Sequence, residues 1–381
     1  MRILHTSDWH LGRIFCGTHL TGDQETALES LTDLIGQAGI DAVVIAGDVF
    51  DRAVPPVDAV NLLDDTLNRI VFGLKKPVIA IAGNHDSPDR LAFGSGFFTA
   101  HGLHVFGQPG ARGGLVVLED RHGPVAFCAL PYADAPYVRA ALGDEAITGH
   151  EEAMAALVRG AEAASAGFAR RVAVAHTFVA GGQLSDSERP LSVGGTVSVP
   201  AGLFGEFQYT MLGHLHRPQK AGENGAYSGS LMKYSFDEAG HKKTVSIVEI
   251  GSDGAAAVET VELKQRRDVR VLRGRLQDLI RTAETDTGRG DYIKAVLTDE
   301  GAIFDAMGQL RKAYPNALAI EREFITAAAQ GKAVAGDYRK FTDFDLFCDF
   351  YIQVTGRPLG EGSLPALRMA LEELGRGGGE P

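Results

Sequence analysis

Short apolar runs in the first quarter of the chain are each followed by a cluster of Asp, Asn or His. The runs at 3–6, 42–46 and 78–82 read as strands, and helical patterns at about 23–37 and 57–71 separate them. This alternating β-α-β-α-β order predicts parallel strands covered by helices. Because parallel strands end at the same edge of a sheet, we expect the polar clusters to meet there.

The middle of the chain is richer in strands. Residues 115–118 and 125–130 flank a polar turn and read as a hairpin. A helix is expected at about 151–164, followed by further strands at 172–175, 209–212 and 245–250. Together with the first part, this pattern predicts an α/β fold in which two packed mixed β-sheets are flanked by helices.

Four polar clusters stand at the ends of predicted strands: Asp8-Trp9-His10-Leu11-Gly12, Gly47-Asp48-Val49-Phe50-Asp51, Gly83-Asn84-His85-Asp86 and Gly213-His214-Leu215-His216. A further histidine, His176, follows another strand. A single Asp or His after a strand is usually a turn or structural residue, but the joint pattern points to a site. In an extended backbone residues i and i+2 face the same side, so Asp8 and His10 are expected to bind one cation together.

The candidate ligands offer only nitrogen and oxygen donors, which suit Mn²⁺, Fe²⁺ or Zn²⁺. Seven of them are counted: Asp8, His10, Asp48, Asn84, His176, His214 and His216. Seven donors are too many for one tetrahedral ion and suit two divalent ions that share a carboxylate. Two ions about 3.5–4 Å apart are the usual device for hydrolysing a phosphoester.

These four clusters and His176 resemble the motifs of the calcineurin-like metallophosphoesterase superfamily. A longer resemblance, to the bacterial SbcD family of nuclease subunits, covers residues 1–90, 185–195, 213–219 and 227–236, and it weakens after about residue 250. It implies the calcineurin-like phosphoesterase fold, two manganese ions, and a partner ATPase of the SbcC type with a long coiled coil.

The resemblance also implies a role for each site residue. Asp8, His10, Asp48 and His216 would hold one metal ion. Asn84, His176, His214 and the shared Asp48 would hold the other. His85 would be the catalytic residue that contacts the scissile phosphate. Archaeal relatives carry a histidine at the position of Asp51, which leaves either an accessory or a structural role for that residue.

Three domains are expected: a metallophosphoesterase (nuclease) domain at 1–265, a small α/β capping and DNA-binding domain at 266–335, and a helical partner-binding segment at 340–381. Residues 264–281 hold seven Lys and Arg against two Asp, so this run either contacts DNA phosphates or is a solvated basic face. A hinge is expected at 331–336.

Two C-terminal helices carry apolar faces, one of Phe347, Phe350, Tyr351 and Val354 and one of Leu364, Leu367, Leu371 and Leu374. They would dock on the SbcC-type coiled coil, or pack on the chain's own core. Homodimerisation through the catalytic domain is implied by the family, and the helix at 57–71 could serve it. No P-loop sequence is present, so ATP hydrolysis would fall to the partner.

The overall charge is acidic, with 37 Lys and Arg against 49 Asp and Glu and a net charge of −12. This balance argues against DNA binding by bulk charge and predicts that the chain alone grips DNA weakly. The three cysteines, Cys16, Cys128 and Cys348, are too few for a disulfide framework. With no signal peptide or membrane segment expected, the sequence predicts a cytoplasmic protein.

The leading hypothesis is a manganese-dependent DNA nuclease subunit, acting as an exonuclease on double-stranded ends and as an endonuclease on single strands and hairpins. Its roles would lie in DNA repair, recombination and replication. The alternative is a phosphatase or phosphodiesterase for a small phosphoester, against which the C-terminal third of the chain argues. A scaffold that has lost its chemistry would not need the full ligand set and His85.

Overall fold

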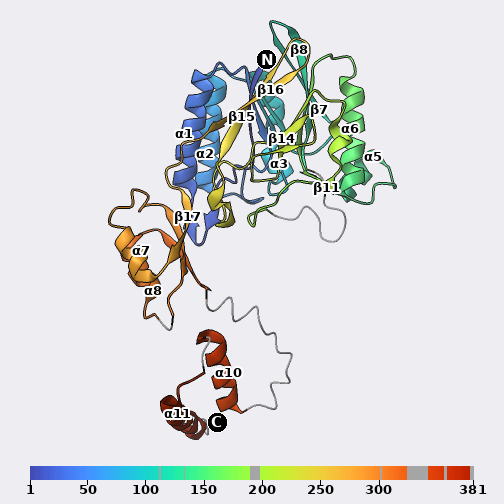
Figure 1. The fold of residues 1–381 in the computed structure, drawn as a ribbon. Coiled ribbons are helices and arrows are strands. Elements are labelled where there is room, and N and C mark those ends of the chain that lie inside the picture. The colour runs from blue at the N-terminus through green and yellow to red at the C-terminus, as the bar shows by residue number, and fades with distance from the viewer. Residues whose placement is uncertain are drawn as a thin grey trace. The chain divides into compact units, whose positions relative to one another are not determined.

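Two six-stranded mixed sheets face each other in the first part of the computed structural model, with helices on their outer faces (Figure 1). The structure describes residues 1–110, 113–132, 134–188, 198–300, 303–323, 342–355 and 358–377. The chain divides into two units, Met1–Asp268 and Val269–Pro381. The expected hinge at 331–336 lies outside the described residues.

The first sheet has the strand order β16-β15-β1-β4-β5-β6. Strands β1, β4, β5 and β6 are parallel, and β15 and β16 extend the sheet in antiparallel pairs. The bounds are β1 Arg2–Thr6, β4 Ala42–Ala46, β5 Val78–Ile81, β6 Leu103–Phe106, β15 Thr244–Ile250 and β16 Ala256–Glu262. Every residue of β4 is buried, as its continuous apolar sequence predicts for a strand covered on both faces.

The second sheet has the order β13-β14-β12-β9-β8-β7. Strands β8, β9, β12 and β14 are parallel, and β7 and β13 close the edges in antiparallel pairs. The bounds are β7 Gly114–Asp120, β8 Gly123–Leu130, β9 Arg171–His176, β12 Tyr209–Gly213, β13 Gln219–Ala221 and β14 Gly225–Tyr227. The expected hairpin at 115–130 is therefore present as β7 and β8.

Helices cover the outer faces of the two sheets. In Figure 1, α1 (Thr21–Gln37) and α2 (Val57–Asn68) lie on one side, and α5 (Ala135–Leu142) and α6 (His150–Ser165) lie on the other. The helix α2 continues as a π-helical turn, η1 (Arg69–Gly73). Short elements complete the unit: α3 Pro88–Leu91, α4 Ser95–Phe98, η2 Thr99–His101, η3 Ala201–Phe204, η4 Asp237–Gly240, and the two-stranded pairs β2 Ile14–Phe15 with β3 Thr18–His19 and β10 Phe178–Val179 with β11 Ser198–Val199.

The main core lies between the two sheets. One buried cluster joins apolar side chains of the first sheet, such as Ile3, Val44 and Ile79, to those of the second, such as Phe127 and Met211. A second cluster lies between the second sheet and α6. Two packed mixed sheets with helices on their outer faces are the α/β architecture that the sequence predicts, and this prediction is confirmed.

The second unit begins with a small parallel sheet. Its strands β17 (Val269–Gly274), β18 (Tyr292–Leu297) and β19 (Ala317–Arg322) pack against α7 (Leu276–Thr282) and α8 (Ala306–Ala313) around their own buried cluster. The sequence pattern does not predict α7, because Leu276 and Leu279 stand among charged and polar residues; in the structure both leucines are buried.

Much of the basic run is paired with acidic side chains. Arg267 binds Asp23 at 2.8 Å, Arg270 binds Asp286 at 2.9 Å, and Arg273 binds Glu323 at 2.6 Å. Arg281 pairs with Asp278. Among the described residues, Lys264, Arg266 and Arg275 have no such partner. Most of this run's charge therefore serves intramolecular ion pairs.

Two helices follow near the C-terminus, α10 (Asp343–Thr355) and α11 (Leu364–Gly377), with a 3₁₀ turn η6 (Glu361–Ser363) between them. A capping box begins α10, since Thr342 and Asp345 exchange hydrogen bonds between side chain and backbone. Phe347 and Phe350 are exposed. In the part of the chain that the structure describes, no helix is long and apolar enough to cross a bilayer.

Candidate metal centre

The predicted site residues follow the carboxyl ends of five parallel strands, three in the first sheet and two in the second. Asp8 follows β1, Asp48 follows β4, and Asn84 and His85 follow β5. In the second sheet His176 is the last residue of β9 and His214 follows β12. Because the two sheets pack face to face, these ends form one buried cluster, in which Asp8, His10, Asp48, His176 and His216 are all at most 1% exposed.

The pairing of β1 with β4 continues beyond the strands into the site loops. The backbone N–H of Asp8 donates to Gly47 O at 3.0 Å, and that of His10 donates to Asp48 O at 3.0 Å. The two loops are thereby held in register, and their side chains enter the cluster together.

The backbone of these loops is not extended, so that part of the sequence argument is wrong. Asp8, His10 and Asp48 have φ angles of 52°, 46° and 50°, in the left-handed region, and His214 has a φ of 110°. Such conformations are unfavourable for residues with a Cβ and gather at functional sites. Asp8 and His10 still converge, through turned rather than extended backbone.

Glycines precede the site residues because backbone and side chains approach closely there. A Cβ on Gly47 would lie 2.2 Å from His176 Nδ1, and one on Gly83 would lie 2.1 Å from Asp48 Oδ1. A Cβ on Gly213 would lie 1.8 Å from Ala46 O. Each of these distances is far below a van der Waals contact, so a larger residue would displace the site.

Asp48 lies at the centre of the cluster. Its Oδ2 is 3.6 Å from His10 Nε2, 3.6 Å from His176 Nε2 and 4.0 Å from His85 Nε2. Three groups of side chains place their donor atoms within 4.8 Å of one another: Asp8, His10 and His216; His10, Asp51 and His85; and Asp8, Asp48 and His176. Asp8 belongs to two of these groups, and Asp48 Oδ2 lies within 4.0 Å of three imidazoles, so both carboxylates are within reach of more than one imidazole ligand.

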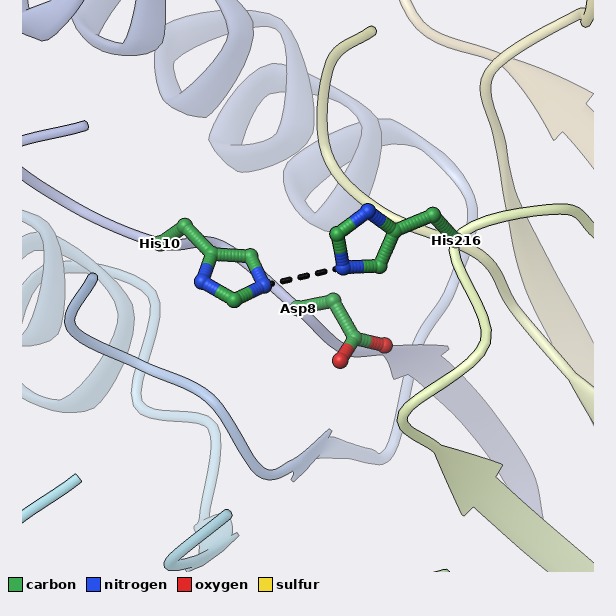
Figure 2. A group of neighbouring side chains, drawn as sticks. All are labelled: Asp8, His10 and His216. Carbon is green, nitrogen blue, oxygen red and sulfur yellow. Dashed lines mark hydrogen bonds between the residues drawn. The ribbon is translucent and has the colours of Figure 1, made fainter. Parts of the chain in front are cut away.

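The first group brings two imidazoles together edge-on, with their ring planes at 65°. His10 Nε2 and His216 Nε2 are 3.0 Å apart, with Asp8 beside them (Figure 2). His10 Nδ1 has no hydrogen-bond partner in the described part of the chain. Two ligands that each lie about 2.1 Å from one ion, at a right angle to each other, are about 3.0 Å apart. The spacing of the two nitrogens therefore fits neighbouring ligands of one cation.

His176 lies beside both Asp48 and Asn84. His176 Nδ1 donates to the carbonyl oxygen of Ala46 at 2.9 Å, which in a neutral imidazole leaves the lone pair on Nε2. This Nε2 is 3.0 Å from Asn84 Oδ1. Two acceptors facing each other at this distance fit a cation that binds both.

The remaining predicted residues are placed less directly. The ring of His214 lies beside that of His176, with centroids 5.5 Å apart, and its backbone N–H donates to Asp8 Oδ1 at 3.0 Å. His85 donates its backbone N–H to Asp48 Oδ1 at 2.9 Å and its Nδ1 contacts Asp51 O at 2.8 Å. The described geometry thus brings all eight predicted residues to one cluster.

Burial shapes the electrostatics of the site. Burial raises the pKa of Asp8 to about 8, an effect opposed by His176 and reinforced by Asp48. Burial also holds the pKa values of His10 and His214 well below their usual range, with neighbouring histidines adding to it. Imidazoles bind divalent cations in their neutral form, and a buried carboxyl such as Asp8 is ionised by a nearby positive charge, which a bound cation would supply. The donor set therefore fits two such ions.

Several supporting residues were not assigned from sequence. Asp86 accepts the backbone N–H groups of Val49, Phe50 and Gly83 and so ties the second and third motifs together. Asp51 forms an ion pair with Arg13 at 2.9 Å. The Gly-Asn-His-Asp motif contains Asp86, so its position at the end of the motif was a usable signal.

A second supporting set surrounds His216, and consists of Ser187, Glu188, Glu238 and Lys243. These residues come from segments with no strand-end pattern. Within the sequence, the only signal for them was that Ser187 and Glu188 lie in one of the runs that resemble the SbcD family.

The chain matches two protein-family models. Residues 1–128 match the family model for calcineurin-like phosphoesterases. Residues 265–355 match the SbcD_C model, described as the type 5 capsule protein repressor C-terminal domain. Among solved structures, the calcineurin-like phosphoesterase YfkN from Bacillus subtilis is similar at 13% identity, with a TM-score of 0.36, over 70% of this chain and 90% of that chain.

The family matches bear on separate parts of the molecule. The first includes the strands that carry Asp8, Asp48, Asn84 and His85, and the second includes the small parallel sheet and α10. The chain is therefore a phosphoester hydrolase by its catalytic fold. It belongs to the calcineurin-like metallophosphoesterase superfamily and carries the C-terminal domain of the SbcD branch.

Proposed function

We propose that this chain is the nuclease subunit of an SbcCD-type complex, which hydrolyses DNA phosphodiester bonds with two divalent ions, a pair of manganese ions. It would act as an exonuclease on double-stranded ends and as an endonuclease on single strands and hairpins, in the cytoplasm, during DNA repair, recombination and replication. The observation that carries the proposal is the convergence of donor atoms in two overlapping groups, Asp8, His10 and His216 in one and Asp8, Asp48 and His176 in the other, with Asn84 against His176.

The site residues divide the work in this proposal. Asp8, His10, Asp48 and His216 would hold one ion, and Asn84, His176, His214 and the shared Asp48 would hold the other. When bound, the two ions would lower the pKa of a water molecule and offset negative charge on the phosphate. The proposed sharing is supported by the distance of 3.6 Å from Asp48 Oδ2 to both His10 Nε2 and His176 Nε2.

His85 is the residue we assign to the scissile phosphate. Its Nδ1 donates to the Asp51 carbonyl oxygen at 2.8 Å, which sets the direction of the ring. Its Nε2 is then the ring atom directed toward the cluster, 4.0 Å from Asp48 Oδ2. An imidazole held at this place would contact a phosphate oxygen and support charge that develops there.

The C-terminal part of the chain favours DNA over a small phosphoester. The match of residues 265–355 to the SbcD_C model supports a capping and DNA-binding domain at 266–335 and a partner-binding segment at 340–381. The exposed Phe347 and Phe350 on α10 suit a contact with the coiled coil of an SbcC-type ATPase. A second copy of this chain is a further proposed partner, through the catalytic domain.

The proposal is tested by the cleavage of labelled duplex DNA with Mn²⁺, comparing the wild type with His85→Ala. We expect the variant to lose at least about 100-fold in rate, because a positioned acid–base or charge-stabilising group contributes about that much. His122→Ala, which removes an exposed histidine at the turn between β7 and β8, is the matched control. Equal digestion by wild type and His85→Ala would refute the assigned role.

The alternative function is tested separately with two small reporters. A bis-phosphodiester reporter should be cleaved in preference to a phosphomonoester reporter. The reverse preference, together with no cleavage of DNA even when the partner ATPase is present, would favour a small-substrate phosphatase.

A further inference from the structure

Two segments outside the metal-ligand motifs converge on the backbone and Nδ1 of His216. Ser187 and Glu188 come from the run at 185–188, and Glu238 lies on η4 (Asp237–Gly240), just before Lys243. Glu238 is 0% exposed and Lys243 is 3% exposed. A fully buried carboxylate and ammonium are costly to keep in a fold, so their contacts call for an explanation.

These residues bind every polar group of His216 except Nε2. The backbone N–H of His216 donates to Glu188 Oε1 at 2.6 Å. Its carbonyl oxygen accepts from Lys243 Nζ at 2.7 Å, and its Nδ1 lies 2.6 Å from Ser187 Oγ. The one ring nitrogen left over, Nε2, is the atom that faces His10 and Asp8 in Figure 2.

The direction of the hydrogen bonds at Ser187 sets the tautomer of His216. Ser187 Oγ donates to Glu238 Oε1 at 2.5 Å. A hydroxyl has one proton to donate, and an ionised carboxylate can only accept. Ser187 must then accept from His216, so the proton of the neutral imidazole is on Nδ1 and the lone pair is on Nε2.

This argument requires Glu238 to be ionised, and its surroundings support that state. Its Oε1 also accepts from Ser235 Oγ at 2.9 Å and from the backbone N–H of Tyr234 at 3.3 Å, while its Oε2 pairs with Lys243. The Tyr234 N–H on one oxygen and the Lys243 ammonium on the other can only donate, which is the arrangement of contacts that an ionised carboxylate takes. Lys243 in turn has three acceptors, on Glu238, His216 and Ser230.

We propose that Ser187 and Glu238, with Lys243 as the counter-charge, are positioning residues that hold His216 in the Nδ1–H tautomer and aim its Nε2 at the cation shared with Asp8 and His10. The proposal rests on the proposed function only in taking this cluster as a divalent-cation site. It explains why the buried Glu238–Lys243 pair is linked by hydrogen bonds to His216. A purely structural ion pair would not need that link.

The variant Glu238→Gln tests the tautomer directly, because Lys243 can only donate. The Gln amide should turn its oxygen to Lys243 and its NH₂ group to Ser187, which reverses the chain of hydrogen bonds. Ser187 would then donate to His216 Nδ1, and the imidazole proton would move to Nε2. Long-range ¹H–¹⁵N spectra of the full chain with ¹⁵N-labelled histidine, free of metal, distinguish the two tautomers, and the His216 signal is assigned by its absence in His216→Asn.

The second readout is Mn²⁺ binding by titration calorimetry on the same full-length chain. We expect Ser187→Ala and Glu238→Gln each to weaken one of two Mn²⁺-binding events by about 10–100-fold, the range found when a residue supporting a metal-bound histidine is lost. Ser187→Thr keeps the hydroxyl and should bind Mn²⁺ with the affinity of the wild type. Ser235→Ala is the matched control, since it removes another hydrogen bond to the same Glu238 oxygen without contacting His216.

The outcomes separate clearly. An Nδ1–H signal that persists in Glu238→Gln, or wild-type Mn²⁺ affinity in both Ser187→Ala and Glu238→Gln, would overturn the proposal. An equal loss of affinity in Ser235→Ala would do the same, because it would point to general damage around Glu238. If Glu238→Gln does not fold, the comparison of Ser187→Ala with Ser187→Thr decides the matter. None of these readouts uses DNA, so they stand apart from a failure of the nuclease assignment.

Discussion

Asp48 and the glycines around it show how single residues build this site. Asp48 has a φ of 50°, and its Oδ2 is 3.6 Å from both His10 Nε2 and His176 Nε2. Gly83 has no Cβ and so leaves room for the Asp48 carboxylate. The glycine is therefore as necessary to the geometry as the ligands.

Gly83→Ala should damage the site while leaving all ligands in the sequence. The new Cβ would lie 2.1 Å from Asp48 Oδ1 and 2.4 Å from Asp48 N, so the loop must shift. We expect about 1–3 kcal/mol lower free energy of unfolding, as for other overpacked sites, measured by urea denaturation, and at least a tenfold loss of metal-dependent hydrolysis. Gly167→Ala, where a Cβ meets nothing within 4 Å, is the control and should behave as wild type.

The sequence predicted which residues would gather but not how. Asp8, His10, Asp48, Asn84 and His176 were identified from their places after predicted strands, because that local signal survives in the sequence. The left-handed backbone angles of Asp8, His10 and Asp48 were not predicted, since they depend on contacts between loops that only the folded chain brings together. Ser187, Glu238 and Lys243 were missed for the same reason, as each acts through distant partners.

At the scale of elements, a buried ion pair stabilises the second sheet at the end opposite to the candidate metal centre. Arg170, just before β9, binds Asp120 at the end of β7 through both guanidinium nitrogens, at 2.7 and 3.0 Å. Arg170 is 3% exposed. The pair ties the hairpin of β7 and β8 to the strand that carries His176 at its other end.

Asp120→Asn should lower stability in a pH-dependent way. The hydrogen bond from Arg170 holds the pKa of Asp120 below its usual range, against the effect of burial. A carboxyl whose folded pKa is lowered stabilises the fold above its unfolded pKa of about 4, and loses that contribution as the pH falls further. We expect the variant to be about 1–3 kcal/mol less stable at pH 7, with a gap to wild type that narrows toward pH 3.

Urea denaturation at several pH values measures this gap. A difference between wild type and Asp120→Asn that stays constant from pH 7 to pH 3 would show that the ionised pair does not contribute as described. Arg121→Ala, an exposed neighbour of Asp120, serves as a control for local changes at the turn.

Most elements were predictable because their patterns are local. The buried strands and the amphipathic α1 and α6 follow directly from apolar periodicity. The helix α7 was not predicted, because the basic and polar residues around its few apolar residues mask the apolar periodicity. The π-helical turn after α2 has no simple signal in the sequence. The antiparallel β16 was also not expected, because most of its residues are exposed and it is held by pairing with β15.

At the scale of the whole molecule, the acidic net charge of −12 and the basic run at 264–281 have to be considered together. Four of the seven basic side chains of that run are paired with acidic residues of the same chain. Lys264, Arg266 and Arg275 are those left without such a partner among the described residues. They are the members of the run best suited to contact DNA phosphates.

Replacing Lys264, Arg266 and Arg275 with Ala should weaken DNA binding and make it less dependent on salt. Each lost phosphate contact reduces the slope of log K against log salt by about 0.9, so the triple variant should lose at most about 3. Arg270→Ala, which breaks pairs with Asp286 and Asp291, should instead lower thermal stability and leave the slope unchanged. This division into paired and unpaired basic side chains would be contradicted if Arg270→Ala reduced the salt dependence of DNA binding and the triple variant did not.

The central claim is that Asp48 stands between two divalent ions, and anomalous scattering from a crystal soaked in Mn²⁺ tests it most directly. The account predicts two anomalous peaks about 3.5–4 Å apart, one beside Asp8, His10 and His216 and one beside Asn84 and His176, with Asp48 in contact with both. A single peak, or two peaks that Asp48 does not join, would contradict it.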